Sequence, residues 1–237
     1  MSTLKRLWRN TAVRGGVVVL AVLALLGAFA PWLGTFDPSA MDPSFISVGA
    51  GTAGQVTMPD GAQFAHTFWM GSDSVGRDVW SRVLYGTRIS MTVGLFTAFV
   101  AIAFGCLLGM LAGYFRAVDA VLMRVMDGVM AIPAVLLAIT LVAVLGASLP
   151  TVILAIAVPE VPRVTRLVRA LVMSLRDEPF VEAARALATA DATILWRDIL
   201  PNALAPLIVQ GTFIAASAVL TEAILSFLGL GLPSDVP

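Results

Sequence analysis

The chain has 237 residues, of which 59% are apolar and only 13% are charged. A soluble domain contains about 25% charged residues, so this chain has too few to cover a folded core with a water-facing surface. This excludes a soluble globular domain, a disordered tail and a nucleic-acid-binding protein, and predicts an all-α integral membrane protein. The 15 basic and 15 acidic residues cancel, so the net charge indicates no partner.

Three residue types are almost missing. Cys106 is the only cysteine, His66 the only histidine and Lys5 the only lysine. A disulfide within the chain is impossible, and neither a Cys/His metal site nor a Cys–His catalytic pair is expected. A phosphate-binding loop needs glycines followed by Lys-Ser/Thr, and Lys5 has no such loop before it. We therefore expect no catalytic residue, metal or bound cofactor here, and predict that His66 is an ordinary loop residue.

The N-terminal segment, residues 1–14, is basic and precedes 22 uncharged residues. A membrane-spanning helix needs about 20 apolar residues, which predicts a first span. A basic segment before an apolar run that ends in Ala-Phe-Ala also fits a cleaved signal peptide. The proline directly after Ala30 and the length of the run favour a retained helix.

Residues 35–87 are rich in Gly, Pro, Ser, Thr and Asp. They are predicted to form a loop or a small cap outside the membrane, with short strands. Near its end, Arg77 and Asp78 are expected to form a local pair that orders the loop, with contact to a binding protein as the alternative.

The remaining residues, 88–237, are predicted to form a membrane-embedded core. The uncharged run 128–159 is too long for one span, and we break it at residues 146–150, because Gly and Pro together mark turns. Five spans follow from the uncharged runs, at residues 15–34, 88–115, 122–146, 150–173 and 203–230.

The basic residues are distributed unevenly between these spans. Twelve of the 15 lie in residues 1–14, 116–124 and 163–197. Because cytoplasmic loops carry the excess of Lys and Arg, the N-terminus and these segments are predicted on the cytoplasmic side.

Residues 174–202 form a cytoplasmic insertion between two spans, and 178–198 are predicted to be helical. Pro179 suits a first helical turn and Glu182 favours the N-terminal end of the helix dipole. One interpretation is an amphipathic connector lying on the membrane. The other is a docking helix, whose small side chains allow close approach to a partner groove and whose polar rim is marked by Glu182 and Arg185.

The insertion resembles the EAA loop of bacterial ABC importer permeases, which favours the docking helix. The resemblance rests on Glu182-Ala183-Ala184 and on Leu200-Pro201. Two positions depart from the family pattern: Ala188 replaces a glycine, and Asp198 replaces an apolar residue. Ala188 keeps the site small but lacks the easy access of glycine to positive φ.

Two further stretches resemble the peptide/nickel branch of these permeases. Residues 71–90 are similar to its Gly-Thr-Asp-x-x-Gly-Arg-Asp element, with Ser72 in place of Thr. Residues 222–231 are similar to its Glu-x-x-Leu-Ser-Phe-Leu-Gly-Leu-Gly element. Three motifs in this order identify the chain as resembling the second, C-type permease subunit of dipeptide/oligopeptide importers. The matching residues of the first element are Gly71, Asp73, Gly76, Arg77 and Asp78.

The resemblance implies a mechanism and a set of partners in the bacterial cytoplasmic membrane. Two homologous permeases pair and enclose a path for peptides. Two ATPase subunits, which hold ATP and Mg, grip the docking helices, and an extracytoplasmic binding protein delivers the substrate. A sixth helix is expected after Pro237. The alternative is a self-contained secondary transporter, or another polytopic membrane protein without an ATPase partner.

Several residues inside the predicted spans have two interpretations. Glu160, which would interrupt a span, and Glu222 either line the translocation path or form a polar bond within the helix bundle. Arginines at every third position indicate one helix face and are interpreted as positive-inside anchors. Glycines at every fourth position indicate close helix packing, either within this chain or against the partner permease. These positions are Arg163, Arg166 and Arg169, and Gly105, Gly109 and Gly113.

Overall fold

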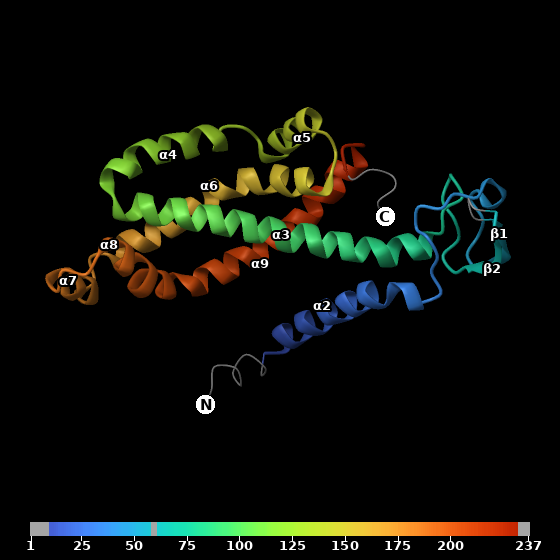
Figure 1. Cartoon of the computed structure of the whole chain (residues 1–237), viewed down its shortest axis with the longest axis horizontal. Coiled ribbons are helices and arrows are strands. Elements are labelled where there is room, and N and C mark those ends of the chain that lie inside the picture. Colours follow the sequence, from blue (N-terminus) through green and yellow to red (C-terminus); the bar gives the residue numbers. More distant parts are fainter. Residues whose placement is uncertain (1–9, 58–60, 232–237) are drawn as a thin grey trace. The chain divides into compact units, whose positions relative to one another are not determined.

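The uncharged runs of the sequence form helices in the structure, a computed structural model that describes residues 10–57 and 61–231. The described residues form two compact units, and the boundary between them falls after Met91, within helix α3 (Val79–Tyr114) (Figure 1). Most of the predicted cytoplasmic segment 1–14 lies outside the described residues.

The first unit begins with helix α2 (Thr11–Phe29), which covers most of the predicted first span. The Asn10 side chain accepts a hydrogen bond from the backbone N–H of Ala12 at 2.9 Å and caps the helix. A short 3₁₀ helix, η1 (Ala30–Trp32), follows. The apolar side chains of α2 are mostly exposed, as expected for a helix surrounded by lipid.

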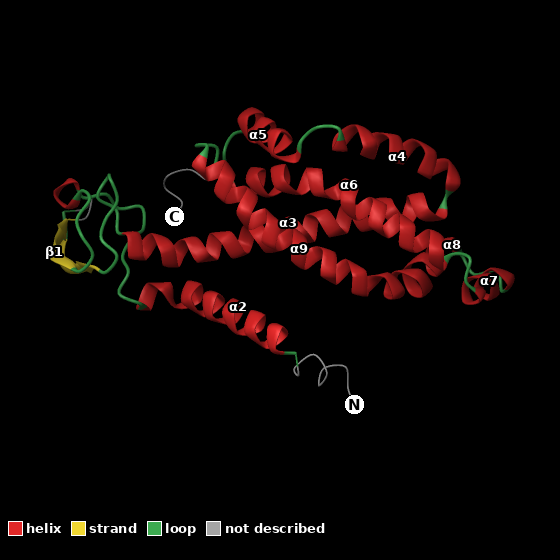
Figure 2. Ribbon diagram, turned by 180° about the vertical axis from the view of Figure 1, so that it is seen from behind, coloured by secondary structure: helices red, strands yellow, loops and turns green. Residues whose placement is uncertain are grey.

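The segment after α2 folds into a small cap around a β-hairpin (Figure 2). Strands β1 (Thr52–Thr57) and β2 (Gln63–Phe68) are antiparallel, with Thr52 opposite Phe68. Phe68 is fully buried, and its ring packs against those of Phe36 and Phe45, the latter in the 3₁₀ helix η2 (Pro43–Phe45). The cap therefore has an aromatic core of its own.

The second unit contains helices α4 (Arg116–Met130), α5 (Ala134–Leu145), α6 (Leu149–Leu175) and α9 (Leu200–Phe227). The predicted span at 122–146 is wrong as a single helix, because α4 and α5 are bent by 85° relative to each other. Pro133 explains the break, since a proline disfavours helical geometry in the residue before it. The predicted turn at 146–150 is confirmed: Gly146 ends α5 with φ of 85°.

Helix α6 runs without a break past Pro159, Glu160 and Pro162, so Glu160 interrupts the uncharged run of the predicted span but not its helix. Among the described residues, three helical stretches are long and apolar enough to cross a membrane, or four if the bent pair counts as one span. The predicted fourth span, which corresponds to α6, is not among them, because its glutamate and three arginines make it too polar. The three stretches are residues 11–32, 79–114 and 191–227.

Helices α3 and α6 pack closely along the glycines that recur every four residues in α3. A Cβ added at Gly105 would lie 2.4 Å from the Cβ of Val164, and one at Gly109 would lie 2.6 Å from that of Val168. Gly113 faces Val172 in the same way. The predicted packing face is confirmed, but it faces this chain's own α6 rather than a partner permease. The three valines are fully buried, so this seam forms the core of the second unit.

Candidate functional site

The insertion after α6 is not the continuous helix that residues 178–198 predicted. It contains helix α7 (Pro179–Ala186), a turn, and the short helix α8 (Asp191–Thr193). A π-helical segment, η3 (Ile194–Ile199), then leads directly into α9. The EAA-type residues therefore divide between α7, which holds Glu182, and the first turn of α9, which holds Leu200 and Pro201.

The turn after α7 has the hydrogen bonds of a Schellman motif. The N–H of Ala188 binds the carbonyl of Arg185 at 2.9 Å, and the N–H of Thr189 binds the carbonyl of Ala184 at 3.1 Å. This motif requires a left-handed residue, usually glycine, just after the helix. Ala188 occupies that position with φ of 56°. Alanine thus adopts here the left-handed conformation that is easily accessible to the glycine of the motif.

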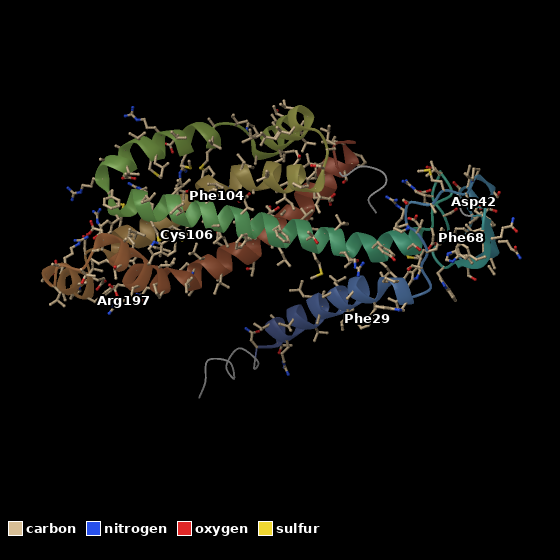
Figure 3. The ribbon with its side chains drawn as sticks, in the orientation of Figure 1. Phe29, Asp42, Phe68, Phe104, Cys106 and Arg197 are labelled. Atoms are coloured by element: carbon tan, nitrogen blue, oxygen red, sulfur yellow. The ribbon has the colours of Figure 1, made fainter. Side chains whose placement is uncertain are left out.

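The π-helical segment before α9 has a local cause in Pro201. Proline has no N–H to donate to the carbonyl four residues earlier, and its ring crowds that carbonyl, which belongs to Arg197. The helix widens instead, and the N–H of Leu200 binds the carbonyl of Leu195, five residues back. Arg197 projects from this segment (Figure 3), and its Nε lies 3.7 Å from a carboxylate oxygen of Asp198.

Helix α7 buries one side and exposes the other. Val181 is fully buried and belongs to the same core cluster as Ile194 and Ile199, which fixes α7 to the start of α9. The opposite side is apolar and yet exposed, with Leu187 at 81% exposure beside the last turn. Glu182 is exposed at its edge. We call the exposed apolar residues the outer face of α7: Phe180, Ala183, Ala186 and Leu187.

Arg185 connects α7 to the last residue of α3. Its guanidinium carbon lies 5.1 Å from the centre of the Tyr114 ring, and its Nε donates to the Tyr114 hydroxyl at 3.4 Å. The hydroxyl in turn donates to Oδ1 of Asp191 at 2.5 Å. The hydrogen bond to Tyr114 is the main cause that raises the pKa of Arg185 above its usual value. In both ribbon views α7 and α8 lie at the end of the unit where α3 ends (Figures 1 and 2).

The outer-loop motif is a compact turn inside the cap. Gly71 and Gly76 have positive φ, and a Cβ at Gly76 would lie 2.0 Å from the carbonyl oxygen of Asp42. Asp73 accepts from the backbone N–H of Arg77 at 2.9 Å and from its Nε at 2.7 Å. Burial raises the pKa of Asp73, but the hydrogen bonds from Arg77 and Val75 together lower it further, so it lies below its usual value.

The predicted pair of Arg77 with Asp78 is wrong, because Arg77 binds Asp73 and Asp78 turns into the cap. Asp78 is fully buried, and its Oδ2 accepts from the N–H of Ser81 at 2.9 Å. It thereby caps the start of α3 at Val79, nine residues before the predicted span. His66 is not an ordinary loop residue: it lies in β2, and its Nε2 is 3.5 Å from Oδ2 of Asp78.

Ser72, which replaces the family's threonine, supplies a hydroxyl that the turn uses. Its Oγ accepts from the N–H of Val48 at 2.9 Å and donates to the carbonyl of Phe45. The serine keeps this hydroxyl, so the departure from the family pattern leaves the bonding of the cap intact.

Glu160 is buried, at 6% exposure, and pairs with Arg163 on the same helix at 2.8 Å. Its second oxygen, Oε2, is buried and has no hydrogen-bond partner among the described residues. The other two arginines of the row bind acids on α4: Arg166 contacts Asp127 at 2.5 Å, and Arg169 binds Asp119 through two bonds. The row interpreted as membrane-surface anchors thus also ties α6 to α4.

Glu222 is half-buried in α9, and its Oε1 accepts from the Ser226 hydroxyl at 2.7 Å, one turn later. This bond within the helix supports the structural interpretation of Glu222. Both residues belong to the third motif, which also supplies Gly229, the left-handed residue that ends α9 with φ of 75°.

None of these arrangements supplies a nucleophile beside a base, and in the described ranges no group of three or more His, Cys, Asp or Glu residues is placed to hold a metal ion. Sequence reasoning missed Tyr114 and Asp191. They lie 77 residues apart, and no local pattern relates them.

Comparison with known proteins places these features in a family. Residues 101–234 match the model of the binding-protein-dependent transport system inner membrane component, and residues 2–48 match the N-terminal TM domain of oligopeptide transport permease C. A putative peptide transport system permease protein of Brucella abortus is 42% identical over 98% of this chain and 73% of its own length.

Two relatives carry more specific names. The dipeptide transport system permease protein DppC of Alkalihalophilus pseudofirmus is 39% identical over 98% of this chain and 72% of its own length. The di/tripeptide transport system permease protein DppC of Pseudomonas aeruginosa is 35% identical over the whole of this chain and 77% of its own length.

Proposed function

Because this chain belongs to the family of binding-protein-dependent transport system inner membrane components, it is a permease subunit of an ABC importer, and we propose that the outer face of α7 is where an ATPase subunit docks. The supporting observation is the apolar, exposed side of a short helix whose other side is fixed in the core. Exposed apolar patches of this kind mark sites of protein contact.

We propose peptides as the cargo and a C-type subunit as the role, because the named relatives transport peptides, dipeptides or di- and tripeptides. A second, homologous permease completes the path. ATP and Mg are held by the two ATPase subunits, and a binding protein delivers the peptide to the cap. This chain performs no covalent chemistry itself.

The proposed orientation in the cytoplasmic membrane places the N-terminus and α7 inside and the cap outside. The distribution of basic residues supports it, since cytoplasmic segments carry the excess of Lys and Arg. Helix α3 begins directly after the cap and ends at Tyr114 beside α8. Its 36 residues correspond to about 54 Å at ~1.5 Å per residue, enough to cross a hydrocarbon core of about 30 Å.

A matched pair of substitutions tests the docking face. Ala183→Glu places a carboxylate on the outer face of α7, and Ala192→Glu makes the same change in α8, where the residue is also exposed. Burying an unpaired charge in an interface costs several kcal/mol. We expect Ala183→Glu to abolish recovery of the ATPase with the purified permease pair, and Ala192→Glu to leave it unchanged.

The measurement is the amount of ATPase subunit that co-purifies from membranes expressing the complete transporter. Recovery of the second permease serves as the control for folding and insertion. Full ATPase recovery with Ala183→Glu would contradict docking on this face.

A further inference from the structure

The hydrogen bonds between Tyr114, Arg185 and Asp191 connect the proposed docking helix to α3. The hydroxyl of one residue, at the very end of α3, joins both halves of the insertion, since Arg185 belongs to α7 and Asp191 begins α8. The turn that contains Ala188 lies between them. Through this single oxygen, the two sides of the turn are bonded to the same helix.

The insertion has two other attachments. Val181 belongs to the core cluster that holds Ile194 and Ile199, in the segment that opens α9, and also Met110 of α3. Arg176, at the start of the insertion, donates from Nη1 to the carbonyl of Gly113 at 3.1 Å, and this bond attaches the end of α6 to α3. Within the described part of the chain, Tyr114 is therefore the residue through which α7 itself is hydrogen-bonded to α3.

The chemistry of the contact makes it specific to the hydroxyl. Hydrogen bonds to charged partners are stronger than those between neutral groups, and here an arginine and a carboxylate bind the same oxygen. The stacking of Arg185 on the ring does not need the hydroxyl. Phenylalanine would keep the ring contact and remove both hydrogen bonds.

We propose that Tyr114 is a positioning residue that transmits movement of α7 to α3. When a docked ATPase displaces α7, the bonds of the Tyr114 hydroxyl carry the displacement to the last turn of α3, which the glycine–valine seam packs against α6. Without the hydroxyl, α7 still docks, but its movement is coupled less tightly to α3. This inference rests on the proposed function, because it requires an ATPase on α7.

The test uses the complete transporter in proteoliposomes with its binding protein, and measures peptide uptake per ATP hydrolysed. For Tyr114→Phe we expect normal ATPase recovery and continued hydrolysis, with uptake per ATP about threefold to tenfold lower, the scale of the net contribution of a typical hydrogen bond. Asp191→Ala should lower uptake per ATP in the same direction but by no more than Tyr114→Phe, because it removes one of the two bonds of the hydroxyl. The double variant should be no worse than Tyr114→Phe alone, because the bond of Asp191 is already lost in that variant.

The matched control is Tyr85→Phe, also in α3. The Tyr85 ring faces a guanidinium as well, that of Arg88, at 5.7 Å. This variant should couple ATP hydrolysis to uptake as the parent does. Unchanged coupling in both Tyr114→Phe and Asp191→Ala would overturn the inference, as would a parallel loss of uptake and ATPase recovery, which indicates damage to the docking site.

Measurements on the unsubstituted transporter distinguish failure of this inference from failure of the proposed function. If the parent transporter recovers no ATPase, the proposed function fails and the inference fails with it. If the parent is coupled and Tyr114→Phe is coupled equally, only the inference fails.

Discussion

Two helices of this chain end in the same way with different residues. The turn after α9 has the same two bonds as the turn after α7: the N–H of Gly229 binds the carbonyl of Ser226 at 3.0 Å, and that of Leu230 binds the carbonyl of Leu225 at 2.9 Å. Gly229 occupies the left-handed position there, and Ala188 occupies it after α7. For an L-residue this conformation costs about 1–2 kcal/mol, which α9 avoids and α7 bears. The hydrogen bonds of the two turns are alike, so their strain differs mainly through one methyl group.

The largest effect is expected when the left-handed glycine of the α9 turn is replaced by alanine. Gly229→Ala should destabilise the end of α9 by about 1–2 kcal/mol. The amides of residues 229 and 230 should then exchange with deuterium about fivefold to thirtyfold faster. Gly128→Ala is the control, because Gly128 lies inside α4 with open space around it, and there alanine should slow exchange. Equal effects of the two changes would show that positive φ does not govern the α9 turn.

A smaller effect, a gain in stability, is expected when the left-handed alanine of the α7 turn is replaced by glycine. Ala188→Gly removes the left-handed strain but adds the backbone entropy of glycine, for a net stabilisation of about 0.5–1 kcal/mol. Exchange of the amides of residues 188 and 189 should slow by about twofold to fivefold. Ala186→Gly, two residues earlier within α7, should instead accelerate exchange. If both glycine variants exchange faster than the parent, Ala188 is not strained.

The smallest effect near neutral pH is expected in the cap, where the Asp42 carboxylate stabilises a turn. Asp42 is buried and accepts from the N–H of Thr57 at 3.0 Å and of Ser44 at 2.9 Å. The bond from Thr57, then that from Ser44, lowers the pKa of Asp42 despite its burial. Its stabilisation is complete above the unfolded pKa of about 3.9 and is lost as the pH falls through the lower folded value.

Acidification should therefore release the Thr57 amide, while the backbone-bonded turns after α7 and α9 stay closed. The measurement is deuterium exchange at Thr57 between pH 6 and pH 3, divided by the intrinsic rate at each pH. Asp42→Asn, which cannot ionise, should remove the pH dependence. A variant that keeps the parent's pH profile would contradict this assignment.

Local signals in the sequence predicted much of the fold. Uncharged runs located the helices, and the Gly146–Pro150 break is where α5 ends and α6 begins. Pro133 divides the segment predicted as one span, although Pro159 and Pro162 do not break α6. Burial decides between these cases, since tertiary packing overrides local propensity, and burial depends on neighbours that a single sequence does not reveal.

The sequence predicted which residues belong to the candidate site, but not which of them contact each other. Glu182, Ala183 and Ala188 were located by their motif, yet the motif predicted one helix where the structure has a strained turn. The bonds of Tyr114 join residues that are distant in the chain, and the ion pair of Arg169 with Asp119 does the same. Such pairs depend on how helices pack, and periodicity within one helix cannot indicate them.

The close packing of α3 against α6 limits which mutations the three α3 glycines can tolerate. Any substitution of Gly105, Gly109 or Gly113 adds at least a Cβ, and at each position that atom would lie less than 3 Å from a valine side chain. A missense mutation in one of these codons therefore cannot be offset by a smaller residue such as alanine at the facing position, because alanine keeps the Cβ and α6 keeps its backbone carbonyls. We expect natural variants of the gene to retain glycine at all three α3 positions, whereas the facing valines can be exchanged for other residues of similar or smaller size.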